Sequence, residues 1–183
     1  MYKLVTAPTA AEILVFIPLT DVRYALGKDT DVTDADVSDD TRLVTLLSIA
    51  YYNVEKKLGR ALLTQTWDYF TNNWESFFEL DYTPLASVTH VKYYDGTNTQ
   101  QTATSGTDYL TTIDVNEVKM INTFSLFNRN DSINIQFVSG QASGAIAPAI
   151  KEGILEEIFG LFFREDRGMR VNEIIHDHRV FVT

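Results

Sequence analysis

The feature that most constrains the fold of this chain is a change of hydrophobic period close to residue 60. Up to Leu58, apolar residues recur at the spacing that places one face of an α-helix in a core. Gly59 then occupies the position where helices commonly end in a left-handed residue. From Leu62 the period changes, and residues 64–71 are rich in β-branched and aromatic residues, with Trp67 and Tyr69 on one side of a strand. The chain is therefore predicted to pass directly from a buried helix into a sheet. The apolar positions of the helix are Leu43, Leu46, Leu47, Ala50, Val54 and Leu58.

An antiparallel β module is predicted for residues 62–140. In its clearest strand, 132–138, Ile133, Ile135 and Phe137 alternate with polar residues, which is typical of a half-buried strand. Asp95-Gly96 is a hairpin turn signal. A small sandwich or barrel is the expected form. The other predicted strands lie near 64–71, 88–94, 107–113 and 117–121.

Helices are predicted on both sides of this module. A short helix follows Thr20, the long helix begins near Ser38, and Pro148 suits the first turn of a third. Residues 1–19 and 166–183 are expected to be extended arms. The predicted fold class is thus α+β, with a small base of about three helices and the β module inserted between the second and third. The predicted divisions, within one compact structural unit, are 1–61 for the N-terminal arm and first two helices, 62–140 for the β module, and 141–183 for the third helix and tail.

The composition indicates a globular protein that does not grip nucleic acid. Hydrophobic residues make up 45% of the 183 residues, which is enough for an ordinary core. The formal net charge of −10 repels phosphate backbones. The longest apolar run, 13–17, is far shorter than the roughly 20 residues that cross a bilayer, so we expect no membrane association. The cytosol is the expected site of synthesis.

The sequence carries no signature of catalysis, and we expect neither an enzyme nor a cofactor. Cysteine is absent, and no nucleophile elbow, P-loop or dinucleotide-binding motif is present. Two metal sites are left open without being predicted. His176 and His178 flank an aspartate, but no further ligands are spaced to join them. The acidic loop 29–40 matches positions 1, 3 and 12 of a calcium loop, yet has Asp34 where glycine is needed.

Three further features each have a structural and a functional interpretation. Gly153 and Gly160 lie two turns apart on the third helix, and they favour close packing against the second helix or contact with a neighbouring subunit. Arg60 follows a helix end, where it either satisfies carbonyls or touches a neighbour. Aromatic residues near the first strand favour core packing, with a carbohydrate platform as the alternative. They are Trp67, Tyr69, Phe70, Trp74, Phe77 and Phe78.

Four stretches together resemble the head–tail connector, or head-completion adaptor, family of tailed bacteriophages. The most specific is 54–67, in which a helix ending in Leu-Gly-Arg-Ala-Leu precedes Gln-Thr-Trp. The others are 20–26, 84–96 and 135–151, and all four occur in the family's order. The resemblance covers most of residues 20–166.

The resemblance implies a structural role in the virion neck. Such proteins form a homo-oligomeric ring, usually dodecameric, beneath the portal protein, and they present a surface to a stopper or tail-completion protein. DNA passes through the channel without being read. Another neck protein, such as a stopper or tail terminator, is the first alternative. A carbohydrate-binding β module with helical decoration is the second.

Within this implied role, we assign portal docking to the third helix and the tail. Arginine is favoured in interface ion pairs, and four arginines of this region stand out in an acidic chain. Local pairing with nearby acidic residues is the alternative. The complete set of candidate interface residues is Arg60, Gly153, Gly160, Arg164, Arg167, Arg170, Arg179 and Phe181.

Overall fold

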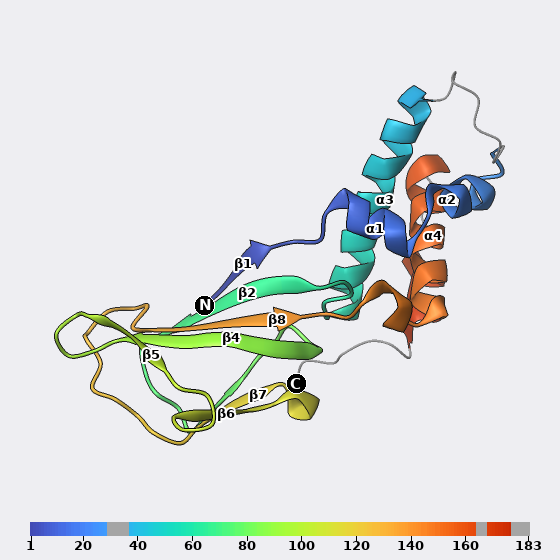
Figure 1. Cartoon of the computed structure of the whole chain (residues 1–183). Helices are drawn as coiled ribbons and strands as arrows, with labels where there is room; N and C mark the ends of the chain where they lie inside the picture. Colours follow the sequence, from blue (N-terminus) through green and yellow to red (C-terminus); the bar gives the residue numbers. More distant parts are fainter. Residues whose placement is uncertain (29–36, 164–167, 177–183) are drawn as a thin grey trace. The chain divides into compact units, whose positions relative to one another are not determined.

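The computed structural model describes residues 1–28, 37–163 and 168–176, and the chain divides into two compact units (Figure 1). The β unit comprises Met1–Ala7 and Thr64–Gln141, and the helical unit comprises Pro8–Leu63 and Ala142–Thr183. The predicted α+β class, with a β module inserted between helices, is confirmed. The inserted module also recruits the first residues of the chain, which the sequence did not indicate.

The β unit contains two antiparallel sheets. A five-stranded sheet has the order β1-β2-β8-β4-β5, and a three-stranded sheet has the order β3-β7-β6. The strands of the first are β1 (Tyr2–Thr6), β2 (Gln65–Thr71), β8 (Ile133–Ser139), β4 (Leu85–Tyr94) and β5 (Gln100–Ala103). Those of the second are β3 (Phe77–Glu79), β7 (Glu117–Met120) and β6 (Tyr109–Thr112).

The alternation predicted for the last strand is confirmed. Ile133, Ile135 and Phe137 of β8 are fully buried, whereas Asn134 and Gln136 between them are half-buried. Because successive side chains point to opposite faces of a strand, β8 places one face of the large sheet in the core. The buried core of the β unit consists of Phe78, Leu80, Leu85, Val91, Ala103, Tyr109, Val118, Met120, Ile133, Ile135 and Phe137.

The helical unit contains five described helices, two more than the sequence predicted. They are α1 (Ala10–Phe16), α2 (Leu19–Ala25), α3 (Val37–Leu58), α4 (Pro148–Phe163) and α5 (Gly168–Ile175). The predicted end of α3 is confirmed, since Gly59 has a left-handed φ of 69°. A core of apolar side chains from all five helices holds the unit together. Its most buried members include Ile13, Val22, Leu47, Val54, Ile154 and Val171.

The prediction of a wholly extended N-terminal arm is wrong beyond β1. Thr9 and Glu12 form a capping box, in which the Thr9 hydroxyl accepts from the Glu12 amide and the Glu12 carboxylate accepts from the Thr9 amide. This arrangement satisfies two amides that a helix start leaves unpaired. Ile13 and Phe16 then face the core from a helix rather than a strand. The spacing Thr-x-x-Glu was the sequence signal for this helix.

The prediction of an extended C-terminal tail is also wrong for Gly168–Ile175, which forms α5. Val171 and Ile175 are fully buried, and they lie one helical turn apart on the face that packs against α4. Burial of this face accounts for the helix, because an isolated helix of such length is marginal in water. Residues 177–183 lie outside the described part of the chain.

Candidate assembly surfaces

The described residues contain no arrangement suited to catalysis at a metal centre. Among them, no three His, Cys, Asp or Glu side chains gather closely enough to hold an ion. The two metal sites left open by the sequence involve loop 29–36 and His178, which lie outside the described ranges. No helix in the described part of the chain is both long and apolar enough to cross a membrane.

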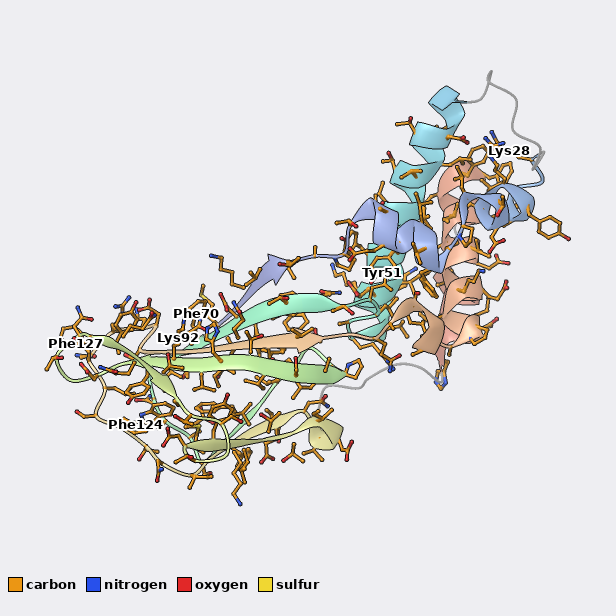
Figure 2. All side chains as sticks on the ribbon, in the orientation of Figure 1. Lys28, Tyr51, Phe70, Lys92, Phe124 and Phe127 are labelled. Carbon is orange, nitrogen blue, oxygen red and sulfur yellow. The ribbon has the colours of Figure 1, made fainter. Side chains whose placement is uncertain are left out.

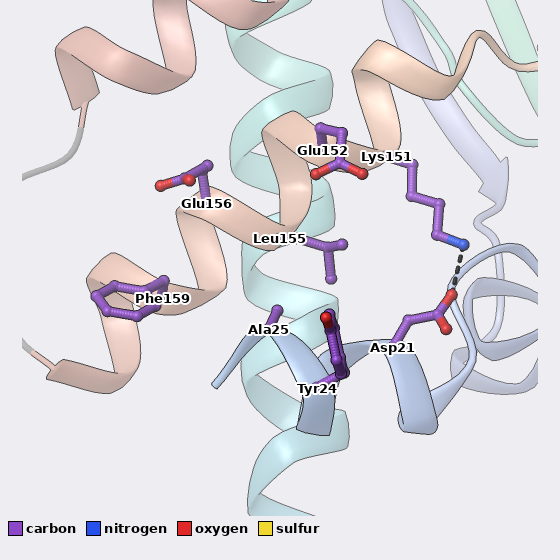
Figure 3. Close-up of a pocket in the computed structure, with 8 residues that line it drawn as sticks. All are labelled: Asp21, Tyr24, Ala25, Lys151, Glu152, Leu155, Glu156 and Phe159. Carbon is purple, nitrogen blue, oxygen red and sulfur yellow. Dashed lines mark hydrogen bonds and ion pairs between the residues drawn. The ribbon is translucent and has the colours of Figure 1, made fainter. Parts of the chain in front are cut away.

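A groove of about 410 Å³ lies between α2 and α4 (Figure 3). One wall is α2, from which Tyr24 projects with 81% of its surface exposed. The other wall is α4, which contributes apolar Leu155 and Phe159 together with two glutamates. An exposed aromatic ring over an apolar floor is typical of a protein contact surface. The complete lining is Asp21, Tyr24, Ala25, Lys151, Glu152, Leu155, Glu156 and Phe159.

The charge of this groove is predominantly acidic. The Lys151 ammonium pairs with the Asp21 carboxylate at 2.5 Å, which joins α4 to α2 and neutralises both groups. Glu152 and Glu156 supply the remaining charges, and Glu152 is exposed. Asp21 and Lys151 are 130 residues apart. No local sequence pattern pairs them, so the groove could not be found without the tertiary structure.

Arg60 is half-buried at the end of α3. Its Nε atom is inaccessible to solvent and has no hydrogen-bond partner among the described residues. The Nε does not, therefore, satisfy the carbonyls that end the helix. Burial lowers the pKa of the Arg60 guanidinium. A buried donor without a partner is costly, and the interface role expected for Arg60 stays a prediction.

Gly153 marks a close approach between α4 and α5. A Cβ atom added there would lie 2.5 Å from Cγ2 of Ile175. The packing partner is thus α5, rather than the second helix that the sequence favoured. Gly160 is also buried on α4. Both glycines sit inside the helical unit.

The candidate residues of the C-terminal region are only partly placed. Arg164, Arg167, Arg179 and Phe181 lie outside the described residues, and Arg170 belongs to α5 with its side chain outside that description. The structure does place two other cations at the C-terminal end of α4. The Lys28 ammonium and the Arg42 guanidinium lie 5.2 and 5.1 Å from the centre of the Phe162 ring, at cation–π distance.

Most aromatic residues of the β unit pack on one another, whereas Phe77 is exposed. The Trp67 ring is stacked on Tyr82 with centroids 3.5 Å apart, and Phe78 is 2% exposed. Phe124, which is labelled in Figure 2, packs edge-on against the Trp74 indole. The indole N–H donates to the Phe124 carbonyl at 2.9 Å. Rings that already cover each other cannot form a flat platform for a sugar. This packing counts against the carbohydrate-binding alternative.

Comparisons with known proteins identify the fold. No protein-family model and no curated protein sequence matches the chain. Solved structures do match. A chain from the "Neck of empty GTA particle computed with C6 symmetry" is 17% identical and superposes with a TM-score of 0.78. A chain from the "Virion of native gene transfer agent (GTA) particle" is 16% identical, with a TM-score of 0.76. A third, from the "Neck of native GTA particle computed with C12 symmetry", is 16% identical with a TM-score of 0.72.

Each superposition covers 100% of this chain and 97% of the neck or virion chain. The two units therefore occur together in those chains, without a large insertion or missing element. At such low identity the likeness defines a shared fold. It is the fold of a chain from the neck of a gene transfer agent particle.

Proposed function

We propose that this protein is a structural subunit of the neck of a tailed phage or phage-like particle. The observation that carries the proposal is the superposition of the entire chain on a neck chain with a TM-score of 0.78. The resemblance of residues 20–166 to head–tail connectors is an independent sequence observation. Together they favour an assembly protein over an enzyme.

Within the neck, the connector position is the specific proposal. The chain forms a homo-oligomeric ring, a dodecamer, that binds the portal on one side and a stopper or tail-completion protein on the other. One related neck is described with C12 symmetry, which is compatible with twelve copies. Five described helices in this chain favour the connector over stopper or tail-terminator proteins, which are chiefly β.

The charge of the chain suits a channel through which DNA moves. Twelve copies of a chain with net charge −10 give on the order of −120 for the ring. DNA phosphates are repelled by such a surface, so DNA passes without adhering. A ring that gripped DNA through basic residues would slow its exit.

Binding to heads tests the connector position against the stopper position. Purified protein would be mixed with DNA-filled heads that carry a portal but no other neck protein, and the heads would then be sedimented. A connector is expected to cosediment with these heads and to restore attachment of purified tails when the remaining neck proteins are added. Cosedimentation only after another neck protein has bound would assign the chain to the stopper position instead.

Portal docking by α4 and the tail requires its own variants. Truncation at Gly168 would remove α5, whose Val171 and Ile175 are part of the helical core, and would confound binding with folding. Truncation after His176 preserves α5. We expect this variant, or one with glutamine at Arg164, Arg167 and Arg179, to lose cosedimentation with heads while retaining its melting temperature. Unchanged cosedimentation would overturn the assignment of the tail.

A further inference from the structure

A stripe of exposed residues runs along α3 on the side opposite its buried face. Its members follow one another at alternating spacings of three and four, which is the spacing of a helix–helix seam. The middle of the stripe is apolar, with Ile49 43% exposed and Tyr52 38% exposed. We call this surface the α3 stripe. It consists of Thr45, Ile49, Tyr52 and Lys56, all of them exposed.

The α2–α4 groove lies on the side of α4 that faces away from α3 (Figure 3). Ile150, Ile154 and Ile158 of α4 are buried in the core that α4 shares with α3. Glu152, Leu155 and Phe159 project from the opposite side of α4 into the groove, with α3 behind the helix (Figure 3). The helical unit therefore carries two unlike surfaces, one on α3 and one between α2 and α4.

The two surfaces are complementary in charge and in the placement of their apolar side chains. Lys56 is an exposed cation at one end of the α3 stripe, and Glu152 is an exposed anion at one end of the groove. Across residues 1–28, 37–163 and 168–176, neither side chain makes an ion pair or hydrogen bond. Each surface also has an apolar middle, which is Ile49 and Tyr52 on α3 and the groove floor on α4.

We propose that the α3 stripe of one copy packs into the α2–α4 groove of the next copy. This contact would be the interface between neighbouring subunits of the ring, and it rests on the proposed function. A closed ring needs two different patches per subunit, because each copy must present one patch forward and the other backward. The occupant of the groove is thus a second copy of this chain. Lys56 pairs with Glu152 of the neighbour in this arrangement.

Helix direction supports the same pairing. Within one copy α3 and α4 are antiparallel, since Asn53 bonds to Glu157 whereas the earlier Arg42 reaches the later Phe162. Rotation about a ring axis that runs roughly along the helices preserves their direction. The neighbour's α3 would then be antiparallel to α4 across the interface as well.

The spacing of residues agrees with an antiparallel contact. Lys56 and Ile49 are seven residues apart on α3, and Glu152 and Phe159 are seven apart on α4. Each interval spans about 10.5 Å along a helix. When Lys56 meets Glu152, Ile49 therefore meets Phe159. Tyr52 is then level with Glu156, one residue or about 1.5 Å beyond Leu155.

Disulfide trapping tests this geometry directly, because the natural chain has no cysteine. The full-length double variant Tyr52→Cys with Leu155→Cys would be assembled into particles and oxidised. We expect a ladder of covalent oligomers that ends at the number of copies in the ring. Each single-cysteine variant should give no ladder. The matched control pairs Tyr52→Cys with Leu110→Cys, a 47% exposed residue of the β unit, and should give none.

The outcomes separate this inference from the proposed function. Neck rings that contain the double variant but give no ladder would overturn the interface and leave the neck assignment standing. A ladder from purified protein that never enters necks would support the interface and overturn the neck assignment. Cross-linking of the Leu155→Cys variant to a different neck protein would overturn a second copy as the occupant.

A charge exchange provides a second test that does not depend on oxidation. Lys56→Glu and Glu152→Lys should each reduce the protein retained per head at least about tenfold, because each places like charges together. The double exchange should restore retention to within about threefold. Lys92→Glu, in the β unit, is the control and should have little effect. A double exchange no better than either single variant, with melting temperatures unchanged, would contradict the pairing.

Discussion

At the scale of single residues, the exit from α3 is fixed by a buried tyrosine. The Tyr51 hydroxyl accepts from the Leu63 amide at 2.9 Å and donates to the Glu55 carboxylate at 3.1 Å. The same carboxylate accepts from the Leu62 amide at 2.8 Å. Two amides beyond the helix are thus satisfied by side chains from its last turns. Burial raises the pKa of Tyr51, with the Glu55 charge acting in the same direction.

Substitution of Tyr51 by phenylalanine is expected to destabilise the protein by about 1–3 kcal/mol, since the Leu63 amide loses its acceptor inside the core. Urea unfolding measures this change. The matched control is Tyr52→Phe, which loses a part-buried hydrogen bond from the hydroxyl to the Pro8 carbonyl. The control should cost less than about 1 kcal/mol. Equal effects would show that the Tyr51 network does not contribute.

Unlike loss of the Tyr51 hydroxyl, loss of the Arg60 guanidinium is not expected to destabilise the isolated subunit. Methionine keeps the apolar stem and removes the guanidinium, whose Nε has no partner in the described structure. Arg60→Met should leave the free energy of unfolding unchanged within about 0.5 kcal/mol, or raise it. Lys57→Met, which loses an ion pair with Glu157, should lower it. Weaker binding to heads without lower stability would place Arg60 at an interface.

Asp95 gives the hairpin between β4 and β5 a dependence on pH. Hydrogen bonds from the Thr97 hydroxyl, the Gln101 amide and the Thr99 backbone lower the pKa of Asp95 from 3.8 to about 2. A lowered pKa stabilises the folded hairpin above pH 3.8, and this contribution is lost as the pH falls toward 2. An NMR titration of the Asp95 carboxyl should therefore have its midpoint near pH 2. Asp95→Asn should remove this part of the acid response.

At the scale of elements, the contact between α4 and α5 depends on the absence of a side chain at Gly153. The close approach of Ile175 to this position explains how so short a helix as α5 is held. A buried methyl group would have to displace α5 or the isoleucine side chain. Because α5 leads to the tail, a shift here would change where the tail begins.

We expect Gly153→Ala to destabilise the protein by about 1–3 kcal/mol, which is typical of overpacking in a core. Alanine has a higher helix propensity than glycine, which offsets part of this destabilisation and sets the lower end of the range. Gly144→Ala is the control, because an added Cβ there meets nothing within 4 Å. Thermal unfolding and hydrogen exchange of the α5 amides measure both variants. If the α5 amides exchanged faster in Gly144→Ala but not in Gly153→Ala, the packing argument would be contradicted.

At the scale of the whole molecule, the chain passes between its two units three times. Residues 1–7 belong to the β unit, residues 8–63 to the helical unit, and the chain then returns to each unit once. Strand β1 is an edge of the large sheet, and the Tyr2 ring packs on Tyr69 with centroids 4.8 Å apart. The start of the chain therefore contributes to the β unit although a helical segment follows it.

Deletion of residues 1–7 should loosen the β unit more than the helical unit. The Phe70 amide, which donates to the Met1 carbonyl at 2.8 Å, is expected to exchange much faster in the deletion variant. The Leu26 amide, which donates to the Val22 carbonyl at 3.1 Å, should exchange at its original rate. Hydrogen exchange with mass or NMR detection distinguishes the two. Equal acceleration at both amides would show that the units unfold together.

The sequence by itself determined the features that arise from local pattern. The buried face of α3 from Leu43 to Leu58, the turn at Gly59 and the alternation in β8 follow from side-chain spacing. All three are confirmed. The same reasoning gave the insertion of a β module between helices. These features were predictable because the periods of helices and strands are properties of neighbouring residues.

Only the tertiary structure decided which distant residues meet. It paired β1 with β2, it placed Gly153 against α5, and it formed the α2–α4 groove from residues 130 positions apart. Short elements such as α5 were missed because their stability comes from burial against partners that no local pattern reveals. The proposed interface has the same origin. Residues 58–67 contain the end of α3, which local pattern predicts. The α2–α4 groove exists only once α2 and α4 have packed.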